Sequence, residues 1–276
     1  MTSVITNKDF LNNIKNHNYD IQEYYLNLSF IENKRQKRFS YKFTGDDDIF
    51  YDLLSHTQTL FNSFLFKIVD LNYGLISSIN SKSYSSSIVI SRTIFEVISM
   101  MFYVNDKLEK ELKINNYSEI YKLLVNFSVS FSLVDKVVNY KRIHVNDAIR
   151  FFGEKILNKE KNYKDFDKLY LDMYSRLSEL SHPAPTSLLV YINENNEIDE
   201  LQTKRTISFS MQSERFQSIF WMIAHSFKLL KIFNLILYEN EDMQIVKDLK
   251  DKKINIINFY KLNPVERIKL ASLFRN

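Results

Sequence analysis

Residues 91–104 have the sequence SRTIFEVISMMFYV, which is the clearest helical pattern of the chain. Most of its side chains are apolar. Four of the polar ones, Arg92, Glu96, Ser99 and Tyr103, fall at positions i, i+4, i+7 and i+11 of a helix. They form one stripe on a helix that is otherwise suited to burial, so the stretch predicts a helix in the protein interior.

The rest of the chain has the composition of a mostly helical protein. Its 276 residues include only three glycines and three prolines, whereas folds built on strands need many more turn residues. We therefore expect an all-α fold. From the apolar periodicity, helices are expected at about residues 47–80, 85–113, 118–140, 145–158, 164–181, 211–239 and 264–273.

One segment departs from the helical pattern. Residues 187–209, SLLVYINENNEIDELQTKRTISF, contain two β-branched and aromatic runs around an Asn-rich turn, which predicts a small β-hairpin inserted between late helices. Three parts of the chain are expected. They are an N-terminal appended helix and linker over 1–45, a helical bundle over 46–240 and a C-terminal helical extension over 241–276.

Composition excludes several classes of protein. With 45% hydrophobic and 14% aromatic residues the chain is too rich in core formers to be disordered. It has no cysteine for a disulfide framework, its first residues lack a signal-peptide pattern, and the apolar run 216–238 is interrupted by polar residues. We expect a cytoplasmic protein without a membrane segment, whose net charge of +4 permits weak attraction to phosphate.

Common cofactor and nucleophile motifs are missing. The five histidines are scattered and form no HExxH motif, three glycines cannot build a nucleotide-binding loop, and no Gly-x-Ser-x-Gly elbow is present. The sequence therefore predicts no metal site and no cofactor. The basic run KRQKR at residues 34–38 could contact nucleic acid, but such a run is more often a solvated helix face.

A second stretch, residues 174–188, YSRLSELSHPAPTSL, carries candidate chemistry. Pro183 disfavours helical geometry for the residue before it, so His182 is expected where a helix ends. The partial negative charge of the last carbonyls favours a protonated imidazole, and such a group can act as acid or base near neutral pH. A straight helix would point Arg176 and His182 about 120° apart, and the proline break could let them converge.

Each charged candidate also has a purely structural interpretation. Arg92 and Glu96 are spaced for an i, i+4 ion pair that fixes helix packing, and leaving either charge buried alone would cost about 3 to 5 kcal/mol. Arg176 could pair with Asp172 at i−4 or with Glu179 at i+3.

The two stretches together carry a resemblance to a known family. Arg176 and His182, separated by five residues in RLSELSH, fit the Arg-x(4 to 6)-His motif of the HEPN superfamily, the helical-bundle domains of many prokaryotic toxins and antiviral ribonucleases. The combination of SRTIFE with YSRLSELSHP resembles uncharacterised bacterial HEPN-like families. The resemblance covers about residues 46–238.

The resemblance implies metal-free RNA cleavage in a homodimer, in phage defence or in a toxin–antitoxin pair with a partner protein. Arg176 and His182 would be the catalytic residues, and the supporting residues would be Arg92, Glu96 and Ser178. Active members of the family usually have a polar residue directly after the arginine, where this chain has Leu177. Two alternatives stay open, which are a non-catalytic module that binds nucleotide, RNA or protein, and a scaffold that only dimerises.

Overall fold

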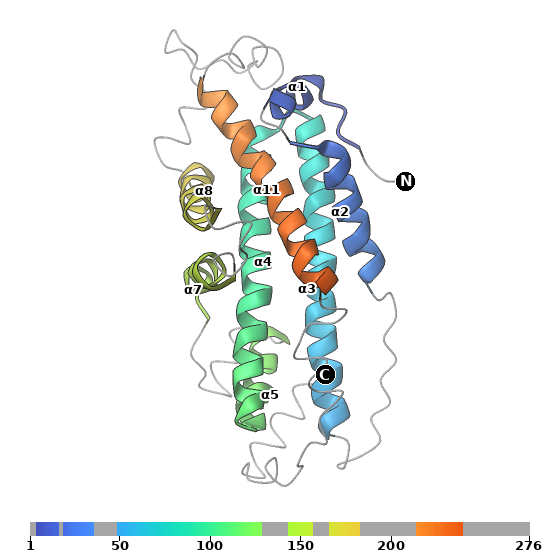
Figure 1. The fold of residues 1–276 in the computed structure, drawn as a ribbon, viewed down its shortest axis with the longest axis vertical. Helices are drawn as coiled ribbons and strands as arrows, with labels where there is room; N and C mark the ends of the chain where they lie inside the picture. The colour runs from blue at the N-terminus through green and yellow to red at the C-terminus, as the bar shows by residue number, and fades with distance from the viewer. Residues whose placement is uncertain are drawn as a thin grey trace.

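The computed structural model describes residues 4–16, 19–35, 49–128, 143–156, 166–182 and 214–239. This part of the chain is helical and contains no strand, which confirms the all-α prediction (Figure 1). The helices are α1 (Lys8–Asn16), α2 (Ile21–Lys34), α3 (Ile49–Asn80), α4 (Tyr84–Lys113), α5 (Tyr117–Ser128), α7 (Val145–Phe151), α8 (Phe166–Ser181) and α11 (Glu214–Glu239).

Two long antiparallel helices, α3 and α4, form the frame of the molecule (Figure 1). The chain reverses between them in a tight turn in which Lys82 has a φ of 58°. The turn is closed by the backbone N–H of Ser83, which donates to the carbonyl of Ser78 at 2.8 Å. A turn this short forces the two helices to pack along their length.

Helix α4 lies at the centre, as residues 91–104 predicted. Helices α3, α5, α7, α8 and α11 all contact it, and Figure 1 shows α7 and α8 on the flank of α4 opposite to α2. By length and composition α4 is the one helix among the described residues that could cross a membrane. However, 56% of its apolar window is buried, and the core helix of a bundle shows the same property.

The N-terminal helices are part of this core. Helix α2 packs against α3 and α11, and α1 packs against α11. The ring of Tyr24 stacks on that of Phe227 with centroids 4.0 Å apart, and Phe10 meets Phe220 edge to face at 5.3 Å. Where one appended helix and a linker were expected, residues 1–45 contain two helices, α1 and α2, and both share one apolar cluster with the central helices.

Helix α7 passes directly into a π-helical turn, Phe152–Ile156, named η2. Phe152 is fully buried there, and its ring lies between those of Phe102 and Tyr170, with centroids 5.3 Å and 5.2 Å away. The expected hairpin at 187–209, the C-terminal extension at 241–276, and the second half of the helix expected at 118–140 lie outside the described residues.

Candidate functional site

The site lies where α8 packs on α4. Tyr170 of α8 is fully buried, its hydroxyl is hydrogen-bonded to that of Ser99, and its ring stacks on Phe95 of α4 at 5.0 Å. Burial raises the pKa of Tyr170, so the phenol stays protonated and keeps this contact at neutral pH. Met173 and Leu177 of α8 are buried as well. These contacts fix α8 beside the polar stripe of α4.

His182 lies at the C-terminal end of α8, as the position of Pro183 predicted. Its backbone N–H donates to the carbonyl of Ser178 at 3.2 Å, which closes the last turn, and its side chain is exposed. The hydroxyl of Ser178 is buried and makes no hydrogen bond of normal geometry among the described residues.

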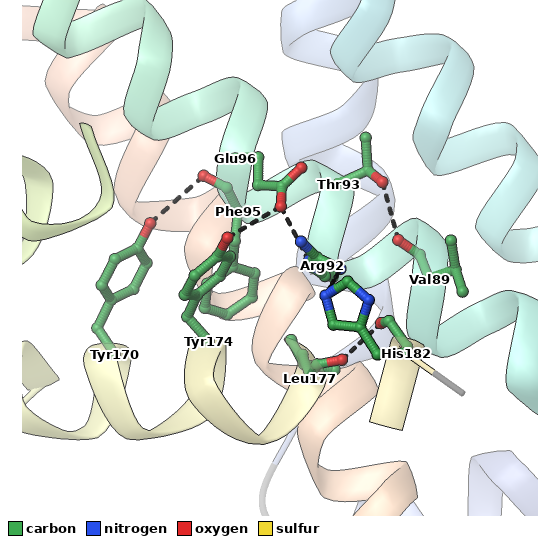
Figure 2. Close-up of polar contacts among 10 residues, drawn as sticks. Val89, Arg92, Thr93, Phe95, Glu96, Tyr170, Tyr174, Leu177 and His182 are labelled. Atoms are coloured by element: carbon green, nitrogen blue, oxygen red, sulfur yellow. Dashed lines mark hydrogen bonds and ion pairs between the residues drawn. The ribbon is translucent and has the colours of Figure 1, made fainter. Parts of the chain in front are cut away.

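The imidazole of His182 meets Arg92 of α4. The distance from Arg92 Nη1 to His182 Nε2 is 3.2 Å (Figure 2). A guanidinium only donates hydrogen bonds, so His182 Nε2 must accept, and the imidazole in this contact is neutral with its proton on Nδ1. The contact therefore presents an imidazole with a defined tautomer.

Arg92 is held from its other side by Glu96. Arg92 Nε donates to Glu96 Oε1 at 2.9 Å, and the hydroxyl of Tyr174 donates to the same oxygen, also at 2.9 Å. The side chains of Arg92 and Glu96 are 24% and 22% exposed. Both charges keep contact with water, and Glu96 has a second donor. Loss of Arg92 should therefore lower the free energy of unfolding by less than it would if Glu96 were left as a fully buried charge.

Tyr174 completes the cluster. Its ring centroid lies 5.9 Å from Arg92 Cζ, close enough for a cation–π contact. Burial, followed by the charge and hydrogen bond of Glu96, raises the pKa of Tyr174, so the phenol remains a donor at neutral pH. Figure 2 shows Arg92 and Glu96 on α4 facing Tyr174 of α8 and His182 directly after the end of α8.

Arg176 is not part of this cluster. Its Nε pairs with Asp172 Oδ2 at 3.0 Å on the same helix, and the two side chains are 56% and 52% exposed. No hydrogen bond or ion pair joins Arg176 to His182 in the part of the chain that the structure describes. The structure thus places against His182 the arginine of the first stretch, and not the one that the motif spacing indicated.

Two further residues of the polar stripe of α4 have structural roles. Ser99 is buried and hydrogen-bonded to Tyr170, and Tyr103 packs edge to face on Phe151 with centroids 5.4 Å apart. Sequence reasoning missed Tyr174 as a site residue. A signal was present, because Tyr174, Ser178 and His182 are spaced four residues apart and so lie along one side of α8.

Among the described residues, no group of three or more histidine, aspartate or glutamate side chains is placed to hold a metal ion. In comparisons with known proteins, no family model, no curated protein and no solved structure matches this chain.

Proposed function

We propose that the chain is a metal-independent endoribonuclease of HEPN type in which Arg92 and His182 act on one phosphodiester of RNA. The observation that carries this proposal is the 3.2 Å contact between Arg92 Nη1 and His182 Nε2. An exposed imidazole beside a guanidinium held by a carboxylate joins an acid–base group to a phosphate-binding group. These two groups are what cleavage through the ribose 2′-OH requires.

The reaction proceeds in one displacement. His182 Nε2 takes the proton of the 2′-OH, the 2′ oxygen bonds to phosphorus, and the bond from phosphorus to the 5′ oxygen breaks. That oxygen leaves with a proton taken from water, and the protonated His182 then returns its own proton to the hydroxide so formed, which restores the base. The other product ends in a 2′,3′-cyclic phosphate. Arg92 stabilises the negative charge that builds up on the phosphorane oxygens.

The free protein holds this site in a resting arrangement. Arg92 Nη1 occupies the lone pair of Nε2 that would take the 2′-OH proton. A phosphate that draws Nη1 toward its own oxygens releases that lone pair, while Nε stays on Glu96. Substrate binding and exposure of the base are then one event.

Arg176 has a secondary role in this proposal. It lies on α8 six residues before His182, which is about 9 Å along a helix axis. Its ion pair with Asp172 is exposed, and such pairs contribute about 0 to 1 kcal/mol, so it opens easily. Arg176 would then bind a neighbouring phosphate of the same RNA strand and not the one that is cut.

A second candidate function is a module that binds RNA or nucleotide without cleaving it. The pairing of Arg176 with Asp172 within one helix favours it, because this arrangement leaves the arginine of the HEPN motif away from His182. In this alternative the Arg92 and His182 pair recognises phosphate and performs no proton transfer.

The localisation, oligomeric state and biological role that we propose are those implied by the resemblance to the HEPN superfamily. We propose a cytoplasmic homodimer that acts in phage defence or in a toxin–antitoxin pair, with two motifs facing a shared cleft. Light scattering should return twice the 33.0 kDa of one chain at micromolar concentration. A single-chain mass would contradict the shared cleft.

The test of the function is incubation of the purified protein with a mixed RNA pool in the presence and absence of EDTA, followed by analysis of the new ends. The proposal predicts cleavage with EDTA present and 2′,3′-cyclic phosphate ends. Dependence on added Mg²⁺ would overturn it. RNA that is retained on the protein but left intact, with retention lost in Arg92→Ala, would establish the binding module.

A further inference from the structure

One carboxylate oxygen joins the two helices of the site. Glu96 Oε1 accepts from Arg92 Nε on α4 and from the Tyr174 hydroxyl on α8, each at 2.9 Å. The Tyr174 ring also lies beside the Arg92 guanidinium, with its centroid 5.9 Å from Cζ. Tyr174 therefore contacts both members of the ion pair on α4 while lying on the helix that ends directly before His182.

We propose that Tyr174 is a positioning residue of this site, which holds Glu96 and through it Arg92, so that Nη1 stays on His182 Nε2. The inference rests on the proposed function for its relevance to RNA. The positioning role itself can be tested without RNA, because it concerns contacts within the free protein.

The reason for such a residue is the length of the arginine side chain. Arg92 has several rotatable bonds and is 24% exposed, so one hydrogen bond to a neighbour in its own helix leaves it many rotamers. Glu96 is 22% exposed and could itself turn toward water. The Tyr174 hydroxyl comes from the other helix and fixes the carboxylate, which restricts the guanidinium to the position that reaches His182.

This arrangement also determines which imidazole nitrogen carries the proton. While Arg92 donates to Nε2, the neutral ring must keep its proton on Nδ1. An imidazole that loses this contact populates both neutral tautomers. The tautomer of His182 therefore reports on the position of Arg92 without any need for RNA.

The variant Tyr174→Phe removes the hydroxyl and keeps the ring. Nitrogen-15 NMR of the full-length free protein can read the protonation of each imidazole nitrogen, with the His182 signals assigned from their loss in His182→Ala. The wild type should show His182 with its proton on Nδ1. Tyr174→Phe should show a mixture of tautomers, and an unchanged spectrum would overturn the proposal.

A matched control exists on the other side of the molecule. The Tyr73 hydroxyl donates to Glu32 Oε2 at 2.8 Å, and Arg35 Nη2 pairs with Glu32 Oε1 at 2.8 Å, so the same three residue types are joined between α3 and the end of α2. Tyr73→Phe removes a hydroxyl with the same chemistry far from His182 along the chain. It should leave the His182 signals unchanged, and a change equal to that of Tyr174→Phe would mean a general structural effect.

A second variant, Glu96→Ala, tests whether Tyr174 acts through Glu96. Glu96→Ala should give a mixture of His182 tautomers at least as pronounced as that of Tyr174→Phe, because it also removes the direct hydrogen bond to Arg92 Nε. The double variant should match Glu96→Ala, because Tyr174 then has no carboxylate to hold. A further change in the double variant would mean that Tyr174 acts by another route, which would overturn the proposal.

Cleavage provides the last readout. In Tyr174→Phe, kcat for RNA should fall about tenfold or more, because Glu96 no longer holds the Arg92 guanidinium where it must stabilise the phosphorane, and a misplaced group slows the chemical step. Tyr73→Phe should keep the wild-type rate. If the wild type cuts no RNA but Tyr174→Phe still alters the tautomer, the ribonuclease function fails while the positioning role stands.

Discussion

Arg92 of α4 and His182 at the end of α8 lie 90 residues apart in the sequence, yet their side-chain nitrogens are 3.2 Å apart. Helix packing alone brings them together, because the buried contact between Tyr170 and Ser99 and the stacking of Tyr170 on Phe95 fix α8 against α4. A site built on two packed helices is more rigid than one on a loop.

The two arginines should differ in their effect on RNA cleavage. Arg92→Ala removes the donor that stabilises charge on the phosphorane, and loss of one such donor costs about 10² to 10³ in rate. Arg176→Ala should have a smaller effect, because Arg176 is exposed and pairs with Asp172. Initial rates on one RNA preparation compare the two variants. A larger loss of cleavage rate for Arg176→Ala would mean that Arg176, the arginine of the Arg-x(4 to 6)-His motif, is the catalytic one.

Arg92→Ala should also destabilise the fold, but only modestly. Glu96 keeps its hydrogen bond from Tyr174 and is 22% exposed, so it is not left as an unpaired buried charge. We expect a decrease of about 1 kcal/mol in the free energy of unfolding. Urea denaturation followed by circular dichroism measures it. A decrease in the range of a buried unpaired charge, about 3 to 5 kcal/mol, would show that water does not reach Glu96.

Tyr170 and Ser99, whose contact anchors α8, should have non-additive effects on stability when they are replaced. Tyr170→Phe leaves the buried hydroxyl of Ser99 without its partner, which should lower the free energy of unfolding by about 1 to 2 kcal/mol. Ser99→Ala should also destabilise. The double variant should lose clearly less than the sum of the two single losses, because it leaves neither hydroxyl unpaired. Additive losses from urea denaturation would mean that the two hydroxyls do not depend on each other.

Stability should fall at alkaline pH. Burial raises the pKa of Tyr84 to about 12, against about 10 in the unfolded chain. Because the folded state holds this proton more tightly, its contribution to stability is complete below about pH 10 and is lost as pH rises through about 12. Burial also raises the pKa values of Tyr170 and Tyr174, which adds to the effect.

Urea midpoints measured between pH 8 and pH 12, with tyrosinate absorbance recorded in parallel, check this dependence. Tyr84→Phe should show a weaker decrease, because it removes one of the phenols that must ionise. A midpoint that stays constant across the whole range would contradict the prediction.

Much of the fold could be predicted from the sequence. The scarcity of glycine and proline left few places to end a helix, so α3 and α4 lie close to the expected bounds of residues 47–80 and 85–113. The π-helical turn after α7 could not be predicted. Phe152 is buried between Phe102 and Tyr170, and these rings come from parts of the chain that no local pattern relates to it.

The site was predictable only within each helix. The i, i+4 spacing gave the pair of Arg92 with Glu96, and Pro183 gave the position of His182. The contact between helices could not be read from spacing, because packing decides which residues of α4 face α8. The motif spacing drew attention to Arg176, whereas its neighbour along the helix, Asp172, pairs with it in the structure.

The proposed role of His182 as the base is tested by the rate of RNA cleavage by His182→Ala compared with the wild type, in EDTA and at equal protein concentration. The side chain of His182 is exposed and carries little packing, so the variant should keep the helicity and the melting temperature of the wild type. We predict a loss of about 10² to 10⁴ in rate, the usual contribution of a positioned acid or base. Cleavage at the wild-type rate by the folded His182→Ala protein would show that His182 is not the base.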